Sequence, residues 1–293
     1  MKSNFLVTGF TKNFIYWLIL LVFVSPAIFA GGPWTQSKSA GFAQLSYSLI
    51  PDYRSLYQSG SSSDAIQLNR DVTDITLSLY FEHGLADNLT VVGVVPYKRG
   101  KTSGETFSGD FSEVLDDGSL NGIGNISAGL KYNFIKKTLL VSGSILVDAN
   151  TGKNEAATGL RTGYDGWGIA PVISIGGSRN NFYAFIDSGL RFRTNSYSNE
   201  FLLNGEAGVQ LFNRLWVIGV LDIRQSINDG TADNENAEQT GLYPDNQEFV
   251  APGFKLIYDI HPRFGINFSR FGAFSGNLVA KKASSTLGVY LRW

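Results

Sequence analysis

The sequence predicts an all-β protein whose mature part is a transmembrane antiparallel up-and-down β-barrel of about 12 strands. Three observations predict this fold. An apolar N-terminal segment resembles a secretory signal, long segments alternate apolar and polar residues, and short turns alternate with long polar connections. Together these features are typical of barrels of the bacterial outer membrane, where we expect the protein to reside.

Composition excludes several classes of function. The 293 residues carry a formal net charge of -1, so no basic surface suggests a nucleic-acid partner. The chain contains no cysteine, which excludes a disulfide scaffold, a thiolate metal site and a cysteine nucleophile. The many Gly, Tyr and Phe residues favour sheet over helix.

The N-terminus has the pattern of a signal peptide. Lys2 and Lys12 precede an apolar run of eleven residues, Phe14–Val24, which is too short to span a bilayer as a helix. We expect cleavage after Ala30, with Ala27 as the alternative. This divides the chain into a signal peptide (1–30), a short periplasmic lead-in (31–41) and the barrel (42–293); the lead-in is too short to form an elaborate plug domain.

The strand assignment rests on a period of two. In Ile75–Glu82 the odd positions are apolar and the even ones are polar or amphipathic, as a half-buried strand requires. The predicted strands are 42–50, 72–82, 89–97, 124–134, 138–148, 168–176, 182–193, 200–212, 215–227, 248–258, 264–274 and 281–293. Most are long enough to cross a bilayer when tilted.

The connections predict which end of each strand faces the periplasm. Short turns follow every second strand, for example 135–137 and 213–214. Long polar connections such as 98–123 and 228–247 follow the first, third, fifth and ninth strands, and shorter polar loops follow the seventh and eleventh. Outer-membrane barrels place short turns in the periplasm and long loops outside. An even number of strands then puts both termini on the periplasmic side.

The last strand ends in the aromatic Trp293. This resembles the C-terminal signal that the barrel-assembly machinery reads, so we expect Trp293 to serve in membrane insertion. Because lipid cannot satisfy an open sheet edge, the barrel must close on itself. We expect a monomer whose partners are outer-membrane lipid, lipopolysaccharide and small-molecule solutes.

Two segments resemble a known family. Glu82–Val91 and the Gly-rich stretch 122–126, followed by Gly129–Tyr132, are similar to blocks of the outer-membrane family named for the MetA pathway of phenol degradation. That family usually carries an acidic residue where this chain has Asn125. The opening stretch from Gly32–Trp34 through Gly41 and Phe42 resembles the XagA-like envelope proteins. The resemblance implies a membrane barrel that passes small apolar or aromatic compounds, and it implies no active-site residues.

We predict that the protein is not an enzyme and binds no cofactor. Its two histidines, His83 and His261, fall in predicted periplasmic turns, far from the outer rim where a Ser/His hydrolase would act on the cell surface. The loop 228–247 is acidic and could attract a hard cation. Its spacing matches no calcium-loop pattern, so a solvated loop is the favoured interpretation and we predict no metal site.

The inward face carries charges that we single out as candidate lumen or constriction residues. An Arg facing lipid at mid-depth costs about 2–4 kcal/mol, so such side chains should point inward. The candidates are Lys131, Asp187, Arg191, Arg193, Glu206, Asp222 and Arg224. They either pair and rigidify a closed barrel or form a constriction that selects solutes. Their mixed signs favour pairing.

Two further features suit apolar transport. Val92, Trp216 and Ile218 are among the apolar residues at predicted inward positions. Pro171 and Pro252 remove ladder donors from predicted strands, so they are candidates for bulges or a lateral exit, the alternative being two tolerated prolines. The leading functional hypothesis is passage of small solutes, hydrophobic or aromatic ones included. The alternative is a closed barrel with a structural or surface role in adhesion, biofilm or envelope-polymer export.

Overall fold

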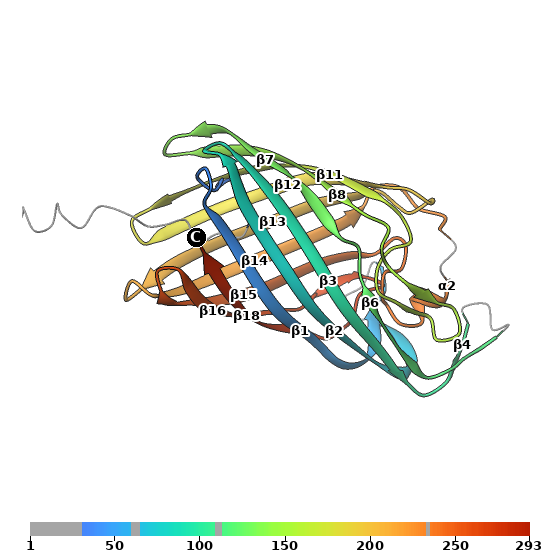
Figure 1. Ribbon diagram of the computed structural model, residues 1–293. Helices are drawn as coiled ribbons and strands as arrows, with labels where there is room; N and C mark the ends of the chain where they lie inside the picture. The colour runs from blue at the N-terminus through green and yellow to red at the C-terminus, as the bar shows by residue number, and fades with distance from the viewer. Residues whose placement is uncertain (1–30, 60–64, 109–112, 233–234) are drawn as a thin grey trace, which may run out of the picture. The chain divides into compact units, whose positions relative to one another are not determined.

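The computed structural model describes residues 31–59, 65–108, 113–232 and 235–293. Here twelve antiparallel strands form a closed barrel, which confirms the predicted fold (Figure 1). They are β1 (Gly41–Tyr57), β2 (Ala65–Ala86), β3 (Leu89–Ser103), β7 (Ser127–Lys136), β8 (Leu140–Asp148), β11 (Gly168–Arg179), β12 (Phe182–Arg193), β13 (Glu200–Leu211), β14 (Leu215–Ser226), β15 (Glu248–His261), β16 (Phe264–Phe271) and β18 (Ser284–Arg292).

Short elements occupy the longer connections. They are β4 (Thr106–Phe107), β5 (Val114–Leu115), β6 (Gly118–Ile123), β9 (Asn154–Glu155), β10 (Leu160–Arg161), α2 (Glu235–Glu238) and β17 (Ser275–Asn277). Among the described residues, no helix is long and apolar enough to cross a bilayer. The predicted signal peptide and its cleavage site lie outside the described residues.

The first and last strands close the barrel. β1 pairs with β18 from Phe42↔Arg292 to Leu49↔Ser285 without a register shift. Trp293 extends this seam, because its backbone N–H and carbonyl both bond to Gly41, at N–O distances of 3.1 and 3.0 Å. Its ring stacks on His83 of β2. The terminal aromatic thus fixes the seam, and its role as an insertion signal stays a prediction.

Most strand ends agree with the sequence pattern, and β12 coincides with the predicted range 182–193. The strand predicted at 124–134 is wrong at its start, since residues 124–126 separate β6 from β7 and both strands pair with β3. Asn125 explains the break. Its amide donates to the carbonyls of Ala149 and Tyr164, so this position bonds to a loop instead of a ladder.

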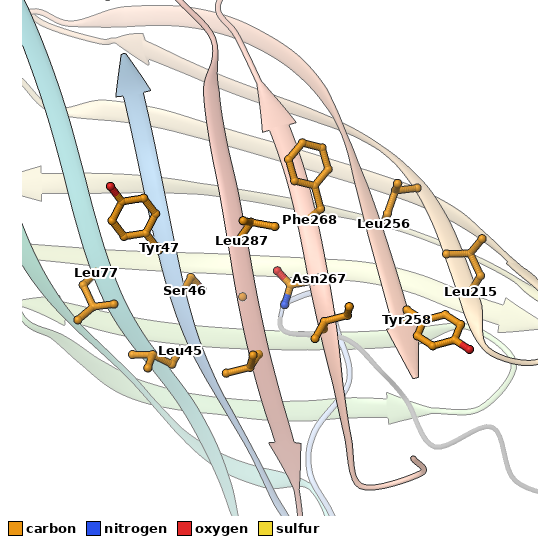
Figure 2. Close-up of a pocket in the computed structure, with 13 residues that line it drawn as sticks. Leu45, Ser46, Tyr47, Leu77, Leu215, Leu256, Tyr258, Asn267, Phe268 and Leu287 are labelled. Atoms are coloured by element: carbon orange, nitrogen blue, oxygen red, sulfur yellow. The ribbon is translucent and has the colours of Figure 1, made fainter. Parts of the chain in front are cut away.

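The two faces of the wall differ in chemistry. Outward positions carry exposed apolar side chains such as Leu79, Ile145 and Ile186, whereas inward positions on the same strands carry buried polar ones such as Glu82 and Ser142. Figure 2 shows part of the outer wall, where Leu45, Tyr47, Leu77 and other apolar side chains line a shallow groove of about 500 Å³. An apolar exterior over a polar interior is the arrangement that a bilayer requires of a barrel.

The two prolines differ, and the bulge prediction is wrong for Pro171 alone. Pro171 keeps its register with β8, and on its β12 side Ala170 and Pro171 lack partners although the register is the same before and after this gap. The missing N–H of proline thus costs a ladder bond there without inserting a residue. Pro252 keeps its register with β14, but on its other side the pairing shifts by one residue between Gly253↔Phe271 on β16 and Val250↔Ser275 on β17, so a bulge lies beside it. A further register shift lies at Asn133/Ile135.

We call the end of the barrel with the short turns the inner end and the end with the long connections the outer end. At the outer end β1 and β2 extend beyond their neighbours and pack with the loops into a small apolar core around Leu56, Val72 and Leu160. Arg70 lies buried beside this core and donates to four backbone carbonyls, those of Gly104, Leu115, Asp116 and Thr158. The outer loops are therefore packed structures.

Candidate functional site

Residues 31–40, which we call the N-terminal segment, lie against the inward face at the inner end. Lys131 Nζ and Asn133 Nδ2 donate to the carbonyls of Trp34 and Pro33, at 3.3 and 2.8 Å. The Gln36 backbone N–H donates to Thr90 Oγ1 at 2.8 Å. The sequence predicted a short lead-in here, and the structure shows that this lead-in contacts side chains from β3 and β7.

Trp34 anchors the N-terminal segment among aromatic rings. It is 8% exposed, and its ring meets those of Tyr183 and Phe185 edge-on, with centroids 5.9 and 5.8 Å apart. Tyr183 in turn meets Trp216 at 5.3 Å. Edge-to-face pairs of this kind each add about 0.5–1.5 kcal/mol beyond apolar burial. The inner part of the lumen is thus an aromatic cluster with Trp34 packed against its wall.

A buried ion pair lies directly beside this cluster. Lys131 Nζ on β7 is 3.0 Å from Glu82 Oε1 on β2, and both side chains are almost fully buried. Glu82 also accepts hydrogen bonds from Gln36 and Tyr80, at 2.7 and 2.5 Å. Because the Glu82 carboxylate has an ion-pair partner and accepts two further hydrogen bonds, its buried charge is compensated. A buried ion pair is tolerated only under this condition.

Asp187 on β12 and Glu206 on β13 are two further acids of the inward face. Glu206 binds Lys255 at 2.6 Å and accepts from the Tyr183 hydroxyl at 3.0 Å. Asp187 Oδ2 accepts from the backbone N–H of Gly32 at 3.4 Å. In register, Asp187 is opposite Asn204, which is opposite Asp222. Asp187 and Asp222 therefore share a level of the ladder, while Glu206 lies two residues nearer the inner end.

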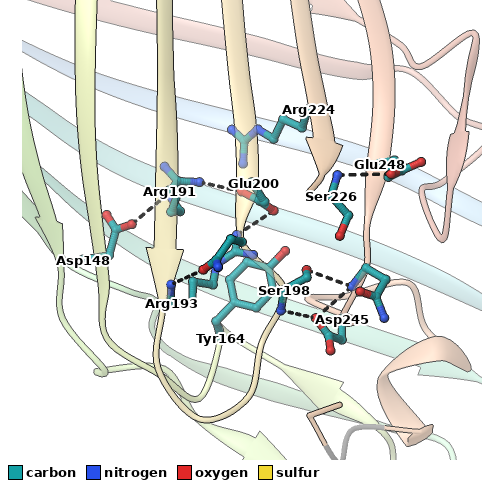
Figure 3. A network of polar contacts seen from close by, with 12 residues as sticks. Asp148, Tyr164, Arg191, Arg193, Ser198, Glu200, Arg224, Ser226, Asp245 and Glu248 are labelled. Atoms are coloured by element: carbon teal, nitrogen blue, oxygen red, sulfur yellow. Dashed lines mark hydrogen bonds and ion pairs between the residues drawn. The ribbon is translucent and has the colours of Figure 1, made fainter. Parts of the chain in front are cut away.

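A charge cluster of Asp148, Arg191, Arg193 and Glu200 lies below the outer loops (Figure 3). Arg191 bridges Asp148 and Glu200, with Nε–Oδ2 and Nη1–Oε2 distances of 3.1 and 3.3 Å. Arg193 Nη2 lies 2.7 Å from the other oxygen of Glu200. β8, β12 and β13 are thereby joined on their inward face by shared ion pairs.

A cavity of about 160 Å³ adjoins this cluster. Arg191, Arg193 and Arg224 line it together with the rings of Tyr164 and Tyr243. The Arg193 guanidinium lies 3.9 Å from the centroid of Tyr164, a cation–π contact. Burial raises the pKa of the Tyr164 hydroxyl, so this loop ring stays neutral. The cavity offers guanidinium groups and aromatic faces to a small molecule.

The remaining predicted charge, Arg224, is the least constrained of the set. It lies 4.0 Å from Asp222, and both side chains remain about one-third exposed. Its guanidinium also lies 5.3 Å from the Phe249 ring centroid. The structure thus brings the predicted charges into several separate groups along the lumen. Their role as a constriction stays a prediction.

Sequence reasoning missed several partners of these charges. Glu82, Asp148, Glu200 and Lys255 all fall at inward positions of the alternating pattern, which was the signal that could have found them. Trp34 gave no such signal, because the N-terminal segment has no alternation.

The other candidates have structural partners. His261 Nδ1 accepts the backbone N–H of Arg263 at 3.2 Å, so this histidine belongs to its turn. In the acidic loop, Asp245 accepts from the backbone N–H groups of Ser198 and Ala232. Asp233 lies outside the described residues. Within the described parts, no group of three or more His, Cys, Asp or Glu side chains could hold a metal ion.

Comparisons with known proteins identify the fold. No family model matches the sequence, and no curated protein matches it. The COG4313 outer membrane channel from Pseudomonas putida F1 is similar with a TM-score of 0.69 and 14% identity, covering 91% of this chain and 100% of that one. The beta domain of the Bordetella autotransporter Brka is similar with a TM-score of 0.51 and 11% identity, covering 87% of this chain and 100% of that one. These likenesses support an outer-membrane barrel fold, while the two families suggested by sequence motifs stay resemblances.

Proposed function

We propose that this protein is an outer-membrane channel that lets small solutes, hydrophobic or aromatic ones included, pass through its lumen. The observation that carries the proposal is the aromatic lining of the inner lumen, where Tyr183 and Phe185 contact Trp34 of the N-terminal segment and Trp216 packs on Tyr183. Such a wall would offer stacking contacts to an aromatic solute once Trp34 is withdrawn.

The cavity beside the outer charge cluster supports the same function. It combines aromatic faces with guanidinium groups, and pockets that orient a small ligand typically join apolar walls to a few polar groups. The barrel from Pseudomonas putida F1 reported above is described as an outer membrane channel, and that description fits the proposed location and role.

The second candidate is a closed barrel with a structural or surface role. The packing of both ends favours it, because the N-terminal segment packs against the wall at the inner end and an apolar core joins the outer loops to β1 and β2. A twelve-stranded barrel lies between the filled eight-stranded and the open sixteen-stranded types, so strand number does not decide.

Two experiments separate the candidates. Residues 31–293 are refolded and recorded in planar bilayers beside a variant lacking 31–38. A channel predicts rare, small steps for the full chain and steady steps for the deletion variant. Vesicles holding each protein are then tested for uptake of a benzenesulfonate dye against a sugar of similar size. Faster uptake of the dye supports aromatic solutes. If both folded proteins show neither conductance nor uptake, the channel proposal fails and the closed barrel stands.

A further inference from the structure

The carboxylate of Asp187 is incompletely satisfied. Its Oδ2 accepts the Gly32 N–H at 3.4 Å, and Ser174 on the neighbouring β11 also interacts with this group. Its Oδ1 is buried and has no hydrogen-bond partner among the described residues. A buried carboxylate oxygen without a partner is costly, so such an atom in a native protein calls for an explanation.

The nearby cations do not supply that partner. Lys131 is bound to Glu82, and Lys255 is bound to Glu206. Within the described parts of the chain, no Lys or Arg nitrogen lies within ion-pair distance of Asp187, whereas both neighbouring acids have one. A positive charge is therefore missing at this point of the lumen.

The chain itself can provide the charge at Gly31. Gly31 is the residue before Gly32, whose backbone N–H already donates to the Asp187 carboxylate, and the Cα atoms of consecutive residues are about 3.8 Å apart. Both glycines have positive φ, 117° and 68°. A Cβ at Gly32 would lie 2.9 Å from the Phe185 ring, so the close approach at this position requires glycine.

We propose that signal-peptide cleavage after Ala30 creates an α-ammonium group at Gly31 that pairs with the buried Asp187 carboxylate and fixes the N-terminal segment in the lumen. In the cleavage, water adds across the Ala30–Gly31 bond, giving a carboxylate on the released peptide and an ammonium on the mature chain. The precursor has a neutral amide at this position and lacks that charge. Processing is thus coupled to closure of the inner end.

The proposal depends on where the chain is cut and does not depend on what the lumen carries. Cleavage after Ala27 would leave three extra residues, Ile28 to Ala30, before Gly31. The ammonium would then no longer lie next to Asp187. The sequence of the mature N-terminus therefore bears directly on the proposal.

The test measures how well the α-amine is protected. Residues 31–293 are released from an N-terminal fusion so that Gly31 is the first residue, refolded, and treated with acetyl N-hydroxysuccinimide at pH 7. Mass spectrometry follows acylation of the N-terminus. Because a carboxylate partner holds the amine in its unreactive protonated form, we expect about tenfold slower acylation in the wild type than in Asp187→Asn. The control Asp222→Asn removes an acid at the same level and should keep the slow rate.

A second variant guards against misfolding of Asp187→Asn. One alanine added before Gly31 leaves Asp187 intact but displaces the ammonium, so we expect fast acylation and faster hydrogen exchange across residues 33–40. Equal acylation rates in the wild type and in either variant would overturn the proposal. So would a mature protein from outer membranes that begins at Ile28. These measurements use no solute, so they are independent of whether the barrel conducts.

Discussion

The two ends of the lumen are packed in different ways. At the inner end the N-terminal segment, which joins the barrel wall at β1, packs Trp34 against aromatic rings. At the outer end, ion pairs join β8, β12 and β13, and loops that join the wall at both ends pack into an apolar core. A segment that joins the wall at one strand can leave without breaking a strand ladder. The comparison therefore indicates that opening, if the barrel conducts, begins at the inner end.

The charges at the two ends are also organised differently. The inner pair of Lys131 and Glu82 is one cation against one anion, almost fully buried. The outer cluster is shared, since Arg191 contacts both Asp148 and Glu200 while Glu200 contacts two arginines. Removing one charge should therefore harm the inner pair more, because the outer cluster retains alternative partners.

The largest effect is expected at the inner pair. Lys131→Met would leave Glu82 buried without its cation, and breaking a buried pair this way costs about 3–5 kcal/mol. Urea unfolding in lipid vesicles, followed by heat-modifiable gel mobility, measures this loss of stability. The double variant Glu82→Gln with Lys131→Met removes both charges and should recover most of it. An equal loss in the double variant would show that packing, not charge, dominates.

The second effect concerns the N-terminal segment itself. Trp34→Ala removes a buried ring with two edge-to-face contacts, a loss of about 2–4 kcal/mol in docking of the segment. Since the segment joins the wall at β1 alone and belongs to no strand ladder, the loss should appear as faster hydrogen exchange in 31–40 with little change in the barrel strands. Trp167→Ala, at an exposed loop position, is the matched control. Strand exchange that rises equally would contradict independent release of the segment.

A smaller effect is expected in the outer cluster. Glu200→Gln removes the anion shared by Arg191 and Arg193, but the amide still accepts a hydrogen bond and Arg191 keeps Asp148. We expect a loss of about 1.5–3 kcal/mol, the usual contribution of hydrogen bonds to charged groups. The same urea assay measures it. A loss larger than that of Lys131→Met would reverse the contrast between the two ends.

Much of the wall could be predicted from sequence, because the period of two is a local signal. It placed β12 to the residue and put Asp187 and Arg191 on the same face. The ion-pair partners of the inward charges, by contrast, cannot be predicted from a local pattern. Lys131 meets Glu82 on β2, although β3 lies between their strands, and such a pair depends on strand tilt and side-chain reach. Trp34 lies in the lumen because of contacts that the alternation of apolar and polar residues does not predict. The inward positions were thus predictable, and their partners were not.

The smallest change in stability is expected for a substitution in the wall between the two ends. The same substitution tests whether solutes leave through a lateral exit. Pro171→Ala would restore an N–H where Ala170 and Pro171 lack partners on β12. A new hydrogen bond would add about 0.5–1.5 kcal/mol to the free energy of unfolding. Loss of the proline makes the unfolded chain more flexible and removes about 0.4–1 kcal/mol, so the stability should change little. If solutes leave through this gap, the variant should slow vesicle uptake of the aromatic dye, while Pro252→Ala, which leaves the gap between β11 and β12 unchanged, should not. Unchanged uptake in both variants would assign passage to the lumen axis and leave the N-terminal segment as its barrier.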